Sequence, residues 1–100
     1  MVLIYVTCKD GREAKGIAVH LLKKRLIACA NVIPIKSFYW WQGEIANSAE
    51  NLLIAKTMSK KFKDAEKEIK KVHSYNVPCI LRIDATANKE YEKWMEYEIG

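Results

Sequence analysis

The spacing of the apolar residues switches along this chain between strand-like and helix-like periods, and the order of the switches limits the fold more than any other feature. Val2–Cys8 is a continuous β-branched and aromatic run, typical of a buried central strand. Asp10 followed by Glu13 resembles a capping box, and apolar residues then recur at helical spacing up to about Arg25. The chain is therefore predicted to begin with a strand and a helix.

The middle of the chain predicts a long hairpin. The segment Cys29–Trp41 is rich in strand-forming residues, and Gln42-Gly43 predicts a tight turn at its end. Pro34 lies inside the first arm, which indicates an edge strand or a bulge. In the second arm, the polar segment 47–50 indicates an irregular break or bulge, after which a buried strand runs to Thr57.

The apolar stripe across 62–72 predicts a second helix, and 79–85 predicts the last main strand. Asn88 is expected to cap a C-terminal helix. The order βαββαβ with right-handed crossovers predicts an α+β, ferredoxin-like sandwich, with strand order 4-1-3-2 and both helices on one face of the sheet. One hundred residues (1–100) are expected to form a single domain with a long β-hairpin and an extra C-terminal helix.

The tip of the hairpin carries four consecutive aromatic residues, Phe38, Tyr39, Trp40 and Trp41. Such a cluster projecting from the open face of the sheet predicts an interface between subunits, because aromatic side chains are favoured at interfaces and are an aggregation hazard when left exposed. The alternative is that these side chains fold back onto their own sheet.

The formal net charge of +5 is concentrated between Ser59 and Val72, where six lysines meet three acidic residues. We interpret this segment as the polar face of a surface helix, and we expect no nucleic-acid partner, because the segment contains no arginine to bind a phosphate with two parallel hydrogen bonds. No signal peptide and no apolar run long enough to span a membrane is found. Three cysteines without CxxC spacing fit a reducing compartment, so we expect a cytoplasmic protein without a membrane partner.

The predicted topology brings Cys8, His73 and Cys79 to one end of the sheet, with Tyr75 on the loop between the last two. Thiolate and imidazole ligands together suit copper or zinc. Two other interpretations stay open: a buried cysteine is often an inert small hydrophobe, and His73 can instead interact with the carbonyls at a helix end. His20 is expected to be solvated on the polar face of the first helix.

An enzyme is the less favoured class. No residue is placed to orient His73 for nucleophilic catalysis, and no glycine-rich turn presents a nucleophile. The chain contains neither of the standard nucleotide-binding fingerprints, so no organic cofactor is predicted.

Four segments of the chain stand out together: Lys24–Val32, Tyr39–Ile45, Leu53–Thr57 and His73–Pro78. In order and spacing, over nearly the whole chain, they closely resemble the CutA divalent-cation tolerance family. The last segment is similar to the family's His-Pro-Tyr-acidic-x-Pro signature. The resemblance implies a ferredoxin-like fold assembled as a tight homotrimer, in which hairpins wrap adjacent subunits. It also implies tolerance to copper and other divalent ions, and an architecture similar to that of PII signalling proteins.

Residue by residue, the resemblance matches His73 and Tyr75 to the signature, and Cys8 to a cysteine of some members. It places Trp41, Lys56 and Arg25 near the cleft between subunits. Ser74 replaces the proline of the signature, and Asn76 replaces its acidic residue, which removes an oxygen ligand for a hard cation.

The primary hypothesis is a trimeric protein that binds a divalent metal, copper before others, through His73 with Cys8 or Cys79. The alternative is a PII-like signalling or interaction module that binds a small metabolite or protein partner in the clefts between subunits. A third, an acid-base or thiol enzyme, requires a strongly perturbed Cys8 or His73.

Overall fold

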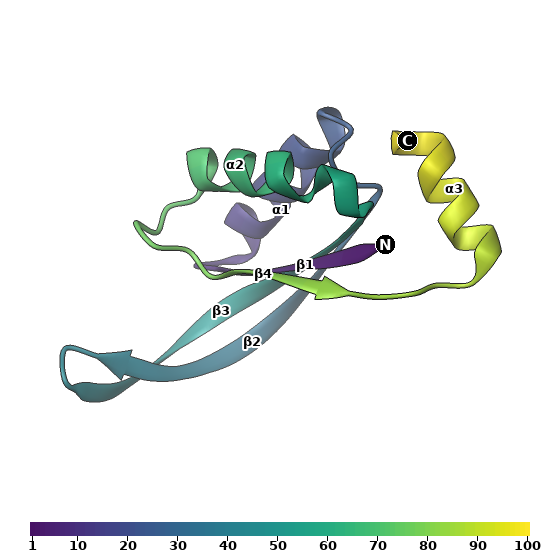
Figure 1. Cartoon of the computed structure of the whole chain (residues 1–100). Coiled ribbons are helices and arrows are strands. Elements are labelled where there is room, and N and C mark those ends of the chain that lie inside the picture. Colours follow the sequence, from purple (N-terminus) through teal and green to yellow (C-terminus); the bar gives the residue numbers. More distant parts are fainter.

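The computed structural model describes all residues, 1–100, and contains one four-stranded antiparallel sheet with the strand order β2-β3-β1-β4. Helices α1 and α2 lie together on one face of this sheet, and α3 stands beside the end at which β1 begins (Figure 1). The predicted fold class and strand order are confirmed. The elements are β1 (Val2–Cys8), α1 (Gly11–Lys23), β2 (Cys29–Trp41), β3 (Glu44–Thr57), the 3-10 turn η1 (Ser59–Lys61), α2 (Phe62–Val72), β4 (Ile80–Asp84) and α3 (Lys89–Ile99).

The core lies between the helices and the sheet. Along β1, every second side chain points at the helices and is buried, while those between them are half-buried on the open face. The side chains of α1 that face the sheet follow the predicted helical stripe and include Ile17 and Leu21. Each fully buried aliphatic side chain of this size contributes roughly 1.5–3 kcal/mol by leaving water. The main cluster consists of Ile4, Val6, Cys8, Ala14, Ile17, Ala18, Leu21, Ile27, Leu53, Ala55, Ala65 and Ile69.

Side-chain and backbone caps fix both ends of α1. At its start, the Oδ1 atom of Asp10 accepts a hydrogen bond from the backbone N–H of Glu13 at 2.8 Å, as the sequence predicts. At its end, Arg25 has a φ of 57°, and the N–H groups of Arg25 and Leu26 donate to carbonyls of the last turn. This is the pattern of a Schellman motif, with an arginine where glycine is usual.

The hairpin of β2 and β3 pairs without interruption from Cys29 opposite Lys56 to Trp41 opposite Glu44. The predicted break at 47–50 is therefore wrong: these residues form a regular strand, in which Asn47 and Ala49 are exposed and Ser48 and Glu50 are half-buried. Pro34 lies in β2, which is an edge strand, and it causes no bulge. Gln42 and Gly43 both have positive φ, 51° and 81°, which is the backbone of a two-residue type I′ turn.

The aromatic residues of the hairpin do not fold back onto the sheet. Phe38, Trp40 and Trp41 are 69%, 74% and 62% exposed in the single chain. Because neighbouring residues on a strand point to opposite sides, Phe38 and Trp40 lie on one side of the hairpin and Tyr39 and Trp41 on the other. The hairpin projects far beyond the end of β1 that carries Cys8 (Figure 1).

Helix α3 closes the other end of the sheet through Met95 and Ile99, which are buried. Asn88 occupies the predicted N-cap position, but its side chain donates to Glu90 rather than accepting from the helix backbone, so the expected capping bond is absent. None of the helices combines the length and the apolar character that crossing a membrane requires.

Candidate functional site

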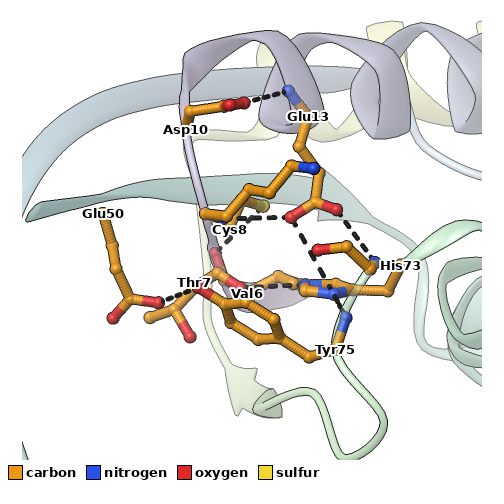
Figure 2. A network of polar contacts seen from close by, with 10 residues as sticks. Val6, Thr7, Cys8, Asp10, Glu13, Glu50, His73 and Tyr75 are labelled. Atoms are coloured by element: carbon orange, nitrogen blue, oxygen red, sulfur yellow. Dashed lines mark hydrogen bonds and ion pairs between the residues drawn. The ribbon is translucent and has the colours of Figure 1, made fainter. Parts of the chain in front are cut away.

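Three elements meet where β1 ends. Cys8 is the last residue of β1, Glu13 lies in the first turn of α1, and His73 directly follows the last turn of α2. The sulfur of Cys8, a carboxylate oxygen of Glu13 and a ring nitrogen of His73 all lie within 4.8 Å of one another (Figure 2). The sequence prediction that Cys8 and His73 meet at this end is thus matched by the geometry, with Glu13 as the third member. We call Cys8, Glu13 and His73 the β1-end cluster.

The ring of His73 is held by two backbone groups. Its Nε2 atom lies 2.9 Å from the carbonyl oxygen of Thr7, which can only accept, so Nε2 carries the proton. Its Nδ1 atom then has a free lone pair and accepts a hydrogen bond from the backbone N–H of Tyr75 at 3.0 Å. An imidazole whose N–H is fixed by a carbonyl and whose other nitrogen is unprotonated has the arrangement typical of a metal-ligating histidine.

The carboxylate of Glu13 joins two loops. One oxygen accepts from the backbone N–H of Lys9 at 3.0 Å and the other from that of Ser74 at 2.9 Å, while His73 Nδ1 lies 3.9 Å from the first oxygen. Burial alone would raise the pKa of Glu13, but these hydrogen bonds and the nearby His73 outweigh it and hold the pKa below its ordinary value. Glu13 is therefore a carboxylate in the folded protein.

Cys8 is fully buried among the core residues. Burial, together with the negative charges of Glu13, Glu50 and Asp10, raises the pKa of its thiol from 9.0 to about 12. Without a bound cation the sulfur therefore keeps its proton at neutral pH. Any cation bound to the sulfur would both replace that proton and neutralise the surrounding acidic groups.

Tyr75 covers the cluster from the side of the α2–β4 loop. Its ring centroid lies 4.8 Å from that of His73, and its hydroxyl donates to Glu50 Oε2 at 2.6 Å (Figure 2). Burial and the hydrogen bond to Glu50 raise the pKa of this hydroxyl. Tyr75 thereby connects the histidine to β3, at the base of the hairpin.

Cys79 does not belong to the cluster, so of the two thiols expected as alternative partners of His73, only Cys8 lies beside it. The side chain of Cys79 is exposed, and it precedes Ile80, which pairs with Val6 on the helix-covered face. The thiol of Cys79 is thus open to solvent, while the thiol of Cys8 is buried in the core between the sheet and the helices.

The other residues expected near the subunit cleft lie apart in the single chain. The Nζ atom of Lys56 is 4.0 Å from the sulfur of Cys29 and lies over the ring of Tyr91, at the far end of the sheet. Arg25 binds the carboxylate of Glu98 on α3 at 2.9 Å, and Trp41 is at the hairpin tip. A cleft that unites them with Tyr75 stays a prediction about the assembly.

His20 is not simply solvated. It lies 2.9 Å from Glu68, which also contacts Lys71 at 2.9 Å and Lys24 at 3.5 Å, so this glutamate joins α1 to α2. The hydrogen bonds of Lys71 and His20 lower the pKa of Glu68 to about 2. The prediction failed because the first helix was considered without the second helix packed beside it.

Glu13 is the site residue that sequence reasoning missed. Its position three residues after Asp10 was interpreted as a capping signal, and its backbone N–H does serve that purpose. The available clue was that the first turn of a helix starting just after Cys8 must lie over the sulfur.

Known proteins are similar to this chain along almost its whole length. The family model for the CutA1 divalent ion tolerance protein matches residues 2–98. The chain belongs to the CutA1 family. Its relatives include divalent-cation tolerance proteins CutA of Archaeoglobus fulgidus, 45% identical with 93% of this chain and 92% of that protein covered, and of Pyrococcus horikoshii, 41% identical with 95% and 94% covered.

Solved CutA structures have the same fold. The periplasmic divalent cation tolerance protein CutA of Archaeoglobus fulgidus superimposes with a TM-score of 0.96, at 42% identity and with both chains fully covered. A CutA1 variant from Pyrococcus horikoshii gives 0.97 at 40% identity, with 100% of this chain and 99% of that chain covered. These CutA proteins confirm the family resemblance and the fold predicted from the sequence.

Proposed function

We propose that this CutA family protein binds copper ions at the β1-end cluster, with the sulfur of Cys8 and Nδ1 of His73 as ligands and Glu13 as a third. The observation that carries this proposal is the approach of a thiol, an imidazole nitrogen and a carboxylate to within 4.8 Å in a buried place. Sulfur and imidazole ligands favour copper and zinc over magnesium or calcium, which require several oxygen ligands.

The cluster is better suited to binding than to catalysis. A thiol with a pKa of about 12 contains very little thiolate at neutral pH and is a poor nucleophile. The hydrogen bond from Nε2 of His73 to Thr7 is retained when Nδ1 binds an ion, and only the N–H of Tyr75 has to leave. The ion replaces one hydrogen bond and one proton, without rearrangement of the strands or helices.

The proposal is tested by anaerobic calorimetric titration of the reduced protein with Cu⁺ and then with Zn²⁺. We expect one tight copper site per chain, weakened at least about 100-fold in Cys8→Ser and in His73→Ala, because each loses a ligand of a two- or three-ligand site. Cys79→Ser removes an exposed thiol outside the cluster and is the matched control. Copper binding that survives in Cys8→Ser but is lost in Cys79→Ser would contradict the assignment.

We also propose that the protein functions as a homotrimer. The trimeric state comes from the family resemblance, and the exposed aromatic residues of the hairpin support assembly, since a monomer rarely leaves so large an apolar surface in water. The open face of the sheet adds Leu81 and Ile83, which are also exposed in the single chain.

Light scattering tests the assembly. We expect about three times the chain mass of 11.5 kDa. Replacing Trp40 and Trp41 together by serine is expected to weaken association by at least about 2 kcal/mol, because tryptophans are frequent hot spots of interfaces. Gln42→Asn at the neighbouring turn is the control, since it keeps all the aromatic residues. A wild-type protein that elutes and scatters as a stable monomer would overturn the trimer.

A further inference from the structure

The β1-end cluster is closed to solvent except at one residue. The side chain of His73 and the whole of Cys8 are 0% exposed, whereas the side chain of Glu13 is 8% exposed. An ion that binds to the sulfur and the imidazole therefore has to come past a group that blocks it, or past Glu13. Binding of an ion at the cluster therefore requires a route through the side chains that surround it.

A surface hollow of about 570 Å³ leads to Glu13. It lies between the first half of α1 and the end of α2, and Glu13, Gly16 and Val72 are among the residues that line it. Its charged lining balances Lys9 and Arg12 against Asp10 and Glu13, so that it presents no net positive charge to an approaching cation. Glu13, the one member of the cluster whose side chain is partly exposed, is also the member that lines the hollow.

Side chains and backbone block the other approaches to the β1-end cluster. On the loop side, the ring of Tyr75 lies against the ring of His73. The backbone N–H of Tyr75 donates a hydrogen bond to Nδ1 of His73, and its hydroxyl donates to Glu50. On the open face of the sheet, the backbone of β1 stands between solvent and the sulfur, because Cys8 points toward the helices like Val6. Figure 2 shows Glu13 on the helix side of the cluster and Tyr75 on the opposite side.

We infer that the ion reaches the β1-end cluster through the hollow between α1 and α2, with Glu13 as the first ligand that it meets. The negative charge of the carboxylate attracts the approaching cation, and the softer sulfur and imidazole nitrogen then hold it. This inference rests on the proposed copper binding. The hollow is lined by residues of α1 and α2, and both helices lie on one face of the sheet (Figure 1). Association through the open face therefore leaves the route free.

Gly16 offers a way to close the route without touching a ligand. It is exposed, and a Cβ atom added to it meets no atom within 4 Å outside its own helical turn, so the first atom of a side chain has free space. Replacing a helical glycine also removes its entropic cost. Gly16→Trp is therefore expected to fold and to fill the hollow, and Gly16→Ala is the matched control with the same backbone change and almost no added volume.

The test is anaerobic stopped-flow mixing of the full-length protein with Cu⁺, followed through the thiolate-to-copper absorption, together with the dissociation rate into a strong copper chelator. In Gly16→Trp we expect binding and release both to slow by at least about tenfold, with an unchanged dissociation constant, since a blocked route changes rates and not the equilibrium. Gly16→Ala is expected to keep both wild-type rates.

The measurements distinguish an error in the proposed copper binding from an error in the proposed route. If wild-type protein shows no thiolate-to-copper absorption at equilibrium, the proposed function is wrong, and this inference is wrong with it. If wild-type protein binds copper and Gly16→Trp binds and releases it at wild-type rates, the route is elsewhere and only the inference is overturned. A weaker equilibrium affinity in Gly16→Trp at an unchanged binding rate would also overturn it, because that result indicates distortion of the site.

Discussion

The two ends of the central sheet each carry a cysteine of a very different kind. At one end, Cys8 is buried beside Glu13 and His73, and acidic groups surround its sulfur. At the other end, Cys29 is half-buried, with the ammonium group of Lys56 at 4.0 Å. A cation bound at Cys29 would meet a like charge, whereas one at Cys8 meets opposite charges. Position in the fold, more than the number of cysteines, decides which thiol suits a metal ion.

The largest expected contrast concerns thiol reactivity. In the metal-free, reduced protein at mildly alkaline pH, iodoacetamide should modify Cys8 at least about 1000-fold more slowly than the exposed Cys79, because a rise in pKa from 9.0 to about 12 lowers the thiolate fraction by about that factor. Mass spectrometry of the cysteine peptides over time measures the rates. The same reaction in guanidinium chloride should remove the difference, and similar rates in the folded protein would refute the account of Cys8.

A second contrast concerns stability. His73→Ala leaves the carbonyl of Thr7 and the N–H of Tyr75 without partners and opens a cavity, so we expect a loss of about 3 kcal/mol in the free energy of unfolding. His20→Ala removes the partly exposed contact with Glu68, for which we expect less than about 1 kcal/mol.

Guanidinium unfolding at one protein concentration compares these two variants, since association adds to the stability of both. Equal losses for the two histidines would show that the network around His73 is not the tighter one.

The fold could be predicted because the apolar residues of each helix and strand follow local, periodic patterns in the sequence. The alternation in β1 and the helical stripe of α2 each define an element, and crossover handedness leaves few arrangements for them. The segment 47–50 was misinterpreted because its polarity was taken to mean irregular backbone. The segment pairs regularly with β2 in a hairpin that continues past the body of the sheet, and its residues alternate between exposed and half-buried in the single chain.

The site was predictable only in part. Topology alone brings Cys8 and His73 to one end of the sheet, since β1 and α2 end there. Topology does not say which side chains near a strand end are buried and which are exposed, and for that reason Cys79 was grouped with Cys8. The role of Glu13 depends on the rotamer that carries its carboxylate to Lys9 and Ser74, which no sequence spacing specifies.

The smallest expected effect concerns Glu68, the carboxylate that joins α1 to α2. The pKa of Glu68 is lowered from 4.5 to about 2 in the folded protein, so the unfolded chain binds more protons between these values. The stability that this carboxylate contributes is complete above about pH 4.5 and is lost as the pH falls toward 2. Urea unfolding across this range should therefore show a smaller decline in Glu68→Gln than in the wild type. Glu66→Gln removes the same charge from α2 without touching His20, and a decline as small as that of Glu68→Gln would trace the effect to the net charge of the helix rather than to the pairing of α1 with α2.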